Sequence, residues 1–395
     1  MVESEYDVIV VGGGPAGAAA ARAAVGGGFN TLLIEKKRMP RHKPCSGYIF
    51  TEAGEFLDEN YGPIPEEVKA EPQHVRGQRL YFGEGKNLDV PIEGISVWRD
   101  RFDQWLCQSS GAEIWDGAPL IDFAEWSDRV ELVVGDGDER RQLKASAMIA
   151  ADGALSGVAG RIDPTFTEGV PYIVTRHEYH IGGADLEPGI FHVFLDAEYG
   201  VYPAVCFKDD FVVIDTSVRR GRKLGPVRDA FHAMLGMEFG FRSRELSRDM
   251  GCSVVFPSAR NRFCLGTGRV LVAGEAAGFM NALGEGISSA LATGHMAGMA
   301  AAESGGKTPG DLYREKVKPE RKRTAMEWSL PALMMGRAKP EFRQTLTSLQ
   351  PLDIIRLTRA ILAWQRSGGV APGLEKEYME VALRRLLHGD YDFRA

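Results

Sequence analysis

Three glycines near the start of the chain have the spacing of a phosphate-binding turn. Gly12, Gly14 and Gly17 follow an apolar run and open an alanine-rich segment. Gly12 permits a tight turn, Gly14 lets a pyrophosphate approach the backbone, and Gly17 lets a helix pack closely on a strand. A helix that begins at Pro15 points its free amides and positive dipole end at the phosphates. We expect Pro15 and Ala16, in its first turn, to lie beside the same ligand.

The elements around this turn form one βαβ unit. The β-branched run Tyr6–Val11 predicts a buried parallel strand, Pro15–Val25 a helix, and Thr31–Ile34 a second strand. Glu35 follows eighteen residues after Gly17, at the end of the second strand, where a carboxylate can accept hydrogen bonds from ribose hydroxyls. This context predicts dinucleotide binding rather than an ordinary glycine turn.

Two later segments separate FAD from NAD. A predicted strand, Met148–Ala151, ends in an acidic turn, and another, Val270–Ala273, ends in GEAAG at 274–278. Gly284 and Gly286 then open a helix predicted to end at Ala302. An NAD site needs only the first βαβ unit, whereas FAD must be held further along its length, by a second helix start and a polar group at the ribityl chain. The pattern therefore favours FAD.

The same segments resemble a known flavoprotein family. They are VVGGGPAGAAAA at 10–21, KPCSGY at 43–48, VWRDRFDQWL at 97–106, ADGALSGVA at 151–159 and VAGEAAGFMNALGEGISSALATG at 272–294. Together they resemble the superfamily that includes p-hydroxybenzoate hydroxylase, and within it they are most similar to the geranylgeranyl reductase family. The resemblance implies an α/β fold with a Rossmann-like FAD-binding domain, an inserted antiparallel β-sheet substrate domain and C-terminal helices.

The resemblance also implies roles for individual residues. Arg99 should contact the flavin side of the cofactor, Asp152 and Gly153 should shape the pyrophosphate region, and Glu275 should bind ribityl or pyrophosphate oxygens. Segment 284–287 should place a helix end beside the isoalloxazine, where its positive dipole stabilises the anionic reduced flavin. The full set of expected cofactor contacts is Gly12, Gly14, Pro15, Ala16, Gly17, Glu35, Lys36, Pro44, Cys45, Ser46, Gly47, Arg99, Leu120, Asp152, Gly153, Gly274, Glu275, Gly284, Gly286 and Ile287.

The sequence departs from the family pattern at three places. Glu275 and Ala282 stand where the family usually has Asp and Pro. The longer carboxylate keeps its charge, while the lost Pro loosens the turn before the flavin. The aromatic motif of the substrate sheet is reduced to YGVYP at 199–203, without its Trp. This last difference leaves the substrate open.

Cys45 is the candidate catalytic residue. By the resemblance, its segment PCSG (44–47) runs past the isoalloxazine, so the thiol either donates a proton or tunes the polarity beside the flavin, or it is a small buried side chain at a tight turn. The other four cysteines, Cys107, Cys206, Cys252 and Cys264, are expected in the core, and none forms a CxxC pair that would suggest zinc or an iron–sulfur cluster. His177 and His180 should face opposite sides of a strand. We therefore expect no metal.

Two enzymatic functions and one non-enzymatic function fit this pattern. The first is reduction of isoprenoid carbon–carbon double bonds by hydride from flavin N5, a step of lipid metabolism. The chain has no second GxGxxG, so electrons would come from transiently bound NAD(P)H or a protein donor, which the basic residues 36–38 and 41–43 could meet. The second is a monooxygenase or halogenase acting on an aromatic or other small apolar substrate. The third is a flavin redox sensor or electron carrier.

Composition limits the partners and the location. The 395 residues carry a net charge of −7, with 44% hydrophobic residues, so the chain is globular and nucleic acid is not expected as a partner. No stretch approaches the ~20 apolar residues of a membrane span, and the acidic start is unlike a signal peptide. We expect a cytoplasmic protein with an apolar or lipid substrate and with peripheral membrane contact left open. The oligomeric state is not indicated.

The motifs also suggest domain boundaries. Residues 1–75, 98–165 and 260–305 should form a discontinuous FAD-binding domain, 76–97 and 166–259 a β-sheet substrate domain, and 306–395 a helical C-terminal region.

Overall fold

The computed structural model describes residues 4–335, apart from 82–86, 91, 138, 282–283 and 304–306. Contacts divide the chain into a large unit, Met1–Trp328, and a second unit that begins at Ser329. Of the predicted helical region, the structure describes α7 (Pro309–Lys316) and α8 (Lys318–Met335). The part of that region after Met335, together with residue 306 and Ala282, lies outside the described residues.

The first sheet contains the predicted βαβ unit. Strand β1 (Ser4–Val11), helix α1 (Pro15–Gly26) and strand β2 (Thr31–Glu35) confirm it to within two residues. The other strands are β8 (Glu113–Asp116), β9 (Leu120–Glu125), β10 (Val130–Asp136), β11 (Glu139–Ala150) and β17 (Val270–Val272). Their order is β8-β2-β1-β11-β10-β9, with β17 also on β11, and β8, β2, β1, β11 and β17 pair in parallel. This is the predicted Rossmann-like arrangement.

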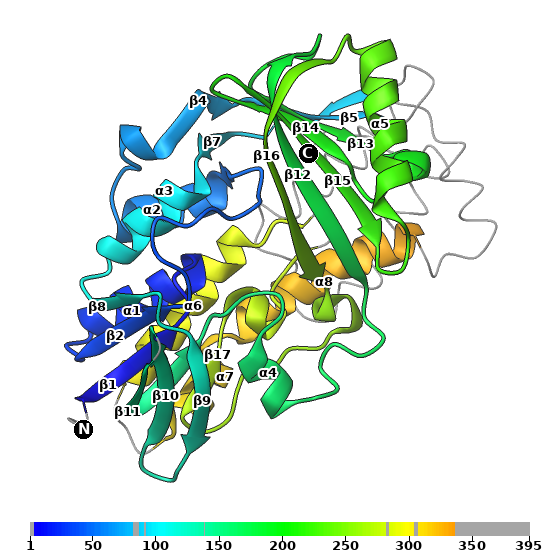
Figure 1. Ribbon diagram of the computed structural model, residues 1–395. Coiled ribbons are helices and arrows are strands. Elements are labelled where there is room, and N and C mark those ends of the chain that lie inside the picture. Colours follow the sequence, from blue (N-terminus) through cyan, green and yellow to red (C-terminus); the bar gives the residue numbers. More distant parts are fainter. Residues whose placement is uncertain are drawn as a thin grey trace, which may run out of the picture. The chain divides into compact units, whose positions relative to one another are not determined.

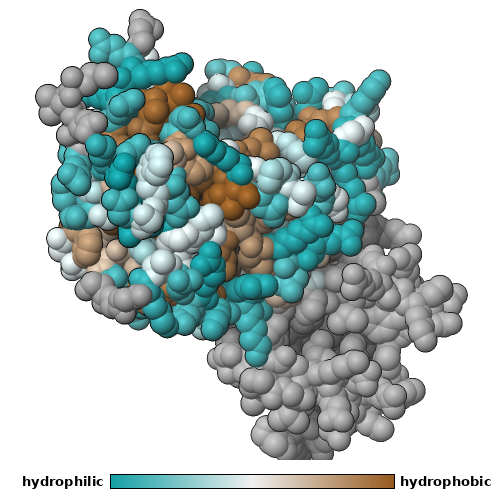
Figure 2. All heavy atoms as spheres, turned by 90° about the horizontal axis from the view of Figure 1, so that it is seen from below, coloured by the Kyte–Doolittle hydropathy of each residue, from teal (hydrophilic) through white to brown (hydrophobic). Residues whose placement is uncertain are grey.

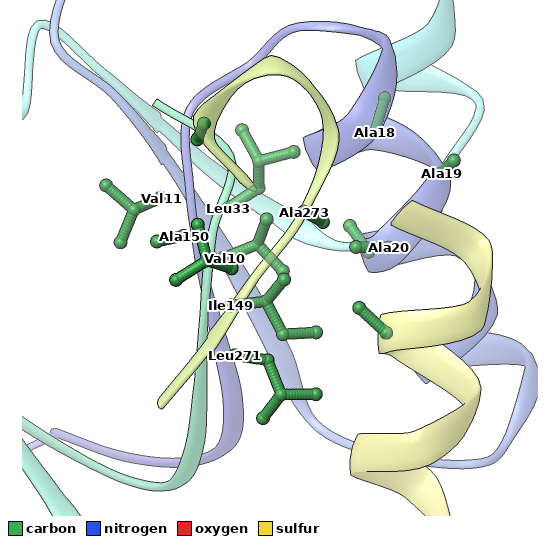
Figure 3. Close-up of a cluster of buried hydrophobic side chains, with 14 of the residues drawn as sticks. Val10, Val11, Ala18, Ala19, Ala20, Leu33, Ile149, Ala150, Leu271 and Ala273 are labelled. Atoms are coloured by element: carbon green, nitrogen blue, oxygen red, sulfur yellow. The ribbon is translucent and has the colours of Figure 1, made fainter. Parts of the chain in front are cut away.

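The core of the large unit lies between these parallel strands and two helices, α1 and α6 (Ile287–Ala302) (Figure 1). Figure 3 shows Val10, Ile149 and Leu271 of three neighbouring strands gathered on one side of the sheet against the helices. All three are fully buried. Helix α1 presents alanines to this core, which lets it approach the strands closely.

The second sheet is mostly antiparallel and contains the predicted strand-rich insert. Its strands are β5 (Gly77–Tyr81), β6 (Asn87–Val90), β12 (Tyr172–Gly183), β13 (Ile190–Phe194), β14 (Ala204–Lys208), β15 (Phe211–Arg219) and β16 (Arg242–Val255). They run in the order β16-β12-β15-β14-β13-β5-β6, and β13 and β5 pair in parallel. Helix α5 (Leu224–Glu238), which the sequence analysis did not predict, connects β15 to β16.

The two faces of this second sheet have different neighbours. Ile214 on one face packs with Phe231 of α5. Val213, the residue immediately before Ile214, points to the other face and lies in a cluster with Tyr48 and Trp98 of the cofactor-binding part. Alternation along each strand thus gives one face to α5 and the other to the candidate site.

A small third sheet joins these parts. It has the order β3-β7-β4 and is formed by β3 (Tyr48–Phe50), β7 (Gly94–Val97) and β4 (Lys69–Val75). The remaining helices are α2 (Thr51–Asn60), α3 (Arg99–Gln108), α4 (Gly157–Ile162) and the 3-10 turns η1 (Glu66–Val68), η2 (Ala197–Tyr199), η3 (Pro257–Arg260) and η4 (Gly274–Ala277). Of segment 76–97, β5 and β6 pair within the second sheet and β7 within the small one. The domain boundaries themselves stay a prediction.

Among the described residues, no helix combines the length and apolar character needed to cross a membrane. Figure 2 shows one face of the molecule, on which hydrophilic side chains surround separate small apolar patches.

Candidate functional site

The turn between β1 and α1 has the geometry that its three glycines predict. Gly12 has φ +109°, and a Cβ there would lie 2.4 Å from the Ala151 carbonyl oxygen. A Cβ on Gly17 would lie 1.8 Å from the Gly12 oxygen, so neither position accepts a side chain. Gly14 differs, because the single atom near its Cβ position is Arg41 Nη2 at 3.8 Å. Gly14 also precedes α1 without a side-chain cap, which leaves the first amides of the helix available to a phosphate.

Glu35 lies beside this turn and already has protein partners. Its Oε2 accepts a hydrogen bond from the Gly13 amide at 2.9 Å and pairs with Arg41 Nε at 3.0 Å. Its Oε1 accepts one from the Lys37 amide at 3.0 Å. The carboxylate therefore fixes the turn, and it has further lone pairs with which to accept a ribose hydroxyl.

The 274–287 segment lies against the 12–17 turn, as the FAD interpretation requires. A Cβ on Gly274 would lie 2.8 Å from Ala16 Cβ. One on Gly294, in α6, would lie 2.0 Å from the Ala16 carbonyl oxygen, so α1 and α6 touch backbone to backbone (Figure 1). Gly286 makes no side-chain cap at the start of α6, but Glu285 Oε1 accepts a hydrogen bond from the Ser288 amide at 2.9 Å. Gly284 has φ +79° with no atom within 4 Å of its Cβ position. The starts of α1 and α6, far apart in sequence, therefore lie on helices that pack together.

A buried ion-pair network connects the turn to α3. Asp103 is fully buried and accepts hydrogen bonds from Arg99 Nε and Nη2, each at 3.0 Å, and from Arg41 Nη1 at 2.8 Å. Arg41 Nη2 in turn donates to the Gly13 carbonyl at 2.9 Å. Burial acts to lower the pKa of Arg41, but Asp103 and Glu35 outweigh it and raise that pKa. One carboxylate thus positions two permanent cations next to the nucleotide turn.

Cys45 lies at the junction of the parts. Its side chain is half-buried, and its Sγ accepts a hydrogen bond from the Gly47 amide at 3.3 Å, within the loop formed by Pro44, Ser46 and their neighbours. Gly47 has φ +67°, and a Cβ there would lie 2.3 Å from the Val97 carbonyl oxygen. The Arg99 guanidinium interacts with Cys45 in addition to Asp103. The partial exposure separates Cys45 from the buried thiols of Cys107, Cys206 and Cys264.

Lys208, at the end of β14, is a site residue that the sequence analysis missed. It is 1% exposed, its ammonium donates to the Val97 carbonyl, and it lies 5.1 Å from the centre of the Trp98 ring. Burial lowers the pKa of Lys208 to about 8, although Cys206 and Cys45 act to raise it. Nothing in the local sequence distinguishes it from an exposed strand-end lysine. By contrast, the i, i+4 spacing of Arg99 and Asp103 on a predicted helix was a usable signal.

Two acidic residues complete the arrangement. Burial raises the pKa of Glu275, while Lys43 and Arg99 act to lower it, and Lys43 Nζ lies 3.9 Å from Glu275 Oε2. Asp152 Oδ2 accepts a hydrogen bond from the Gly157 amide at 2.9 Å. Its Oδ1 is buried without a hydrogen-bond partner among the described residues. Gly153, with φ +85°, has no atom within 4 Å of its Cβ position, which leaves space beside that oxygen.

Two predicted contacts lie at the margin of this group. Lys36 is exposed in the loop after β2. Leu120 is half-buried at the start of β9, two residues after Ala118, whose amide donates to the Glu35 carbonyl at 2.9 Å. Lys36 directly follows β2, which ends at Glu35, and Leu120 follows β8, the neighbouring parallel strand. Their contact with a cofactor stays a prediction.

These features fit FAD. The uncapped start of α1, next to Arg41, suits a pyrophosphate, and the unpartnered Asp152 Oδ1 suits a donor from the bound molecule. At the second helix start, after Gly286, Glu285 already accepts a hydrogen bond from the Ser288 amide, so it is the positive end of the helix dipole that suits the electron-rich edge of a flavin. The open space beside Gly14, Gly153 and Gly284 leaves room for a ligand along this line.

Comparison with known proteins supports this assignment. Residues 7–161 match the family described as FAD dependent oxidoreductase. Digeranylgeranylglycerophospholipid reductase 2 of Methanopyrus kandleri is 29% identical over 205 residues, which cover 49% of each chain. Residues 7–161 are therefore similar to the FAD-dependent oxidoreductases, and the similarity supports an enzyme. Within that class, its predicted resemblance to the geranylgeranyl reductases is confirmed.

The chain shares its fold with solved structures of several kinds of flavoenzyme. A geranylgeranyl bacteriochlorophyll reductase-like protein from Thermoplasma acidophilum has a TM-score of 0.69 at 21% identity, covering 83% of this chain and 88% of that one. The p-nitrophenol 4-monooxygenase PnpA from Pseudomonas putida has a TM-score of 0.70 at 16% identity, covering 94% and 100%. Flavin-dependent halogenases are also similar. At these identities the likeness concerns the fold, and the reaction must be argued from the site.

Proposed function

We propose that this enzyme reduces carbon–carbon double bonds of an isoprenoid, using FAD as the hydride carrier. The observation that carries the proposal is the position of Cys45. Its half-buried thiol interacts with Arg99 and Lys208, where the cofactor-binding part meets the aromatic face of the second sheet. A thiol beside two cations, next to an apolar wall, suits protonation of a substrate that itself has no polar group at the reacting carbons.

The apolar wall is built from both parts of the large unit. Trp98 stacks on Tyr179 with ring centroids 6.0 Å apart, and Phe211 meets both rings edge-on. Tyr48 and Phe191 extend the wall, with centroids 5.3 Å apart. Tyr48, Trp98 and Tyr179 are buried, so this cluster keeps water away from the side of the site next to Cys45, which an unactivated alkene requires.

The residues have separate tasks in this reaction. When bound, reduced FAD supplies a hydride from its N5. The free amides at the start of α1 and the positive end of the α6 dipole would hold the cofactor, and Arg99, which interacts with Cys45, would hold the Cys45 loop beside the flavin. The Cys45 thiol delivers a proton to the neighbouring carbon. Lys208, whose pKa is lowered to about 8 by burial, can return a proton to this region.

The source of electrons and the place of action belong to the proposal too. NAD(P)H or a protein donor would reduce the flavin, a lipid or other apolar molecule would be the substrate, and the enzyme would act in the cytoplasm or at a membrane surface. The exposed basic residues Lys36, Lys37 and Arg38 are one surface for an anionic donor, although Arg38 already pairs with Asp116 at 2.9 Å.

The test is reduction of a defined lipid. Anaerobic, dithionite-reduced holoenzyme is mixed with a digeranylgeranyl glycerophospholipid, and the mass of the product is measured by mass spectrometry. We expect mass gains of two hydrogens per double bond. Cys45→Ala should retain FAD but slow the gain by about 100-fold, the usual contribution of a positioned proton donor. Cys264→Ala, which removes a thiol buried elsewhere in the core, should react at nearly the unaltered rate.

A monooxygenase or halogenase is the second candidate, because both classes share this fold. It predicts no mass gain with the lipid, together with substrate-dependent oxygen uptake by the reduced enzyme in air. That pair of results would replace the reductase proposal.

A further inference from the structure

The face of the second sheet that packs against α5 carries a cluster of buried polar side chains. Glu178 and His180 are two residues apart on β12, so both point to this face, while Tyr179 between them belongs to the aromatic wall. His232 reaches the same place from α5. One ligand atom from each of Glu178, His180 and His232 lies within 4.8 Å of the other two. The cluster is therefore on the opposite face of the sheet from the candidate FAD site.

One atom of each of these three side chains lacks a hydrogen bond of good geometry. Glu178 is 2% exposed and His180 is 4% exposed. Within the described part of the chain, Glu178 Oε2, His180 Nε2 and His232 Nε2 are all buried without a hydrogen-bond partner, although the Glu178 and His232 atoms are only 2.9 Å apart. Such atoms cost free energy unless a ligand or an ion binds them.

The surroundings orient His180 as a metal ligand. Its Nδ1 lies 2.9 Å from Ser243 Oγ, so in the tautomer in which Nδ1 donates to that hydroxyl, Nε2 offers its lone pair to the cluster. Phe241 meets both imidazoles edge-on, with centroids 5.3 and 5.7 Å away, and closes the cluster with an apolar side.

The guanidinium of Arg228 lies near the cluster, but it does not bind the three unpartnered atoms. Arg228 Nη1 lies 4.0 Å from Glu178 Oε1, the oxygen that is not among the unpartnered atoms. Its Nη2 binds Asp229 at 2.8 Å instead. The arginine therefore partly neutralises Glu178 from one side and leaves Oε2 directed at the two imidazoles.

We propose that Glu178, His180 and His232 bind one divalent transition-metal ion of the zinc type. Two imidazoles and one carboxylate are common ligands for Zn²⁺, and bond lengths of about 2.0–2.2 Å require only small side-chain movements from the present spacing. A fourth position would take water. Because the ligands come from β12 and α5, the ion would fasten the helix to the sheet behind the aromatic wall. This site is independent of the substrate, and the proposal departs from the expectation of no metal.

The proposal is tested on the full-length protein with any affinity tag removed. Chelator-treated holoenzyme is titrated with Zn²⁺, and metal content and thermal unfolding are measured. We expect one Zn²⁺ per chain and a Tm increase of about 5 °C at saturating metal. His232→Gln should weaken binding at least 100-fold. His74→Gln, which removes an exposed histidine on β4, should bind like the unaltered protein.

X-ray absorption of the Zn²⁺-loaded unaltered protein gives a second readout if the variant does not fold. Two imidazoles and one carboxylate around the metal would support the site. Failure to bind one equivalent would overturn the proposal, as would equal binding by His232→Gln or a ligand set without two imidazoles. The histidines and Glu178 would then form only a buried ion pair.

Discussion

The nucleotide turn and the second sheet differ in which part of the chain sets their geometry. At the turn the main chain decides the geometry: Cβ atoms on Gly12 or Gly17 would overlap carbonyl oxygens. In the second sheet, an ordinary strand backbone carries buried polar side chains such as Lys208 and Glu178, to which we assign chemistry. A site made by backbone approach fixes the cofactor, whereas one made by side chains can change its substrate without changing the fold. This contrast explains why the same fold serves reductases, monooxygenases and halogenases.

The substitution with the largest expected effect is Gly17→Val, which tests the backbone packing of the nucleotide turn. The new Cβ would lie 1.8 Å from the Gly12 oxygen, so β1 and α1 would have to separate. We expect a loss of more than about 4 kcal/mol in the free energy of unfolding, and therefore no folded, yellow protein. Urea unfolding and flavin absorbance measure this. Gly54→Ala, in α2 with open space at its Cβ position, should instead stabilise by about 0.5–1 kcal/mol. Comparable yields of both variants would contradict the packing.

The second test breaks the network that joins the turn to α3. Asp103→Asn keeps the shape but leaves Arg99 and Arg41 without their shared buried carboxylate. We expect a loss of about 3 kcal/mol, because uncompensated buried charge is costly. The control is Asp116→Asn, whose partner Arg38 has an 81% exposed side chain, and its cost should stay below about 1 kcal/mol. Similar urea midpoints for the two variants would show that the buried network does not stabilise the turn.

The same contrast explains what the sequence could predict. The βαβ unit, the 274–287 turn and the helix after it were predictable because backbone-built sites require glycine at fixed spacings. Lys208 and the Glu178–His180–His232 cluster were not, because each depends on which residues of distant elements meet. His180 was correctly expected to face away from His177, which lies 3.7 Å from Asp215, but its partner on α5 could not be seen without that helix. Side-chain clusters across strands have no local signature.

A third test separates cofactor binding from folding. Gly14→Val adds a side chain in a direction where only Arg41 is near, so the fold should survive. The same side chain occupies the place where a pyrophosphate would approach the backbone. We expect FAD affinity to fall at least 100-fold, about 2.7 kcal/mol, with normal far-UV circular dichroism. Titration of the apoprotein with FAD measures the affinity. A variant that is folded and saturated with FAD would place the phosphates elsewhere.

The smallest effect concerns Lys208 and depends on pH. Burial lowers its folded-state pKa to about 8, below the ordinary value of 10.5, so between these values the unfolded chain holds a proton that the folded chain lacks. The stability of the unaltered protein should therefore carry a penalty below pH 8 that shrinks as pH rises toward 10.5. Lys208→Met removes this penalty and also one hydrogen bond to Val97, whose loss does not depend on pH.

The readout is thus the change with pH, not the stability of the variant itself. From pH 7 to pH 9.5, the stability of Lys208→Met relative to the unaltered protein should fall by about 2 kcal/mol, measured by urea unfolding. Lys307→Met, at an exposed ion pair with Glu315, should show no such trend. A difference that stays constant across this range would mean that Lys208 titrates normally. The second sheet would then lack the proton source that the proposed reaction assigns to it.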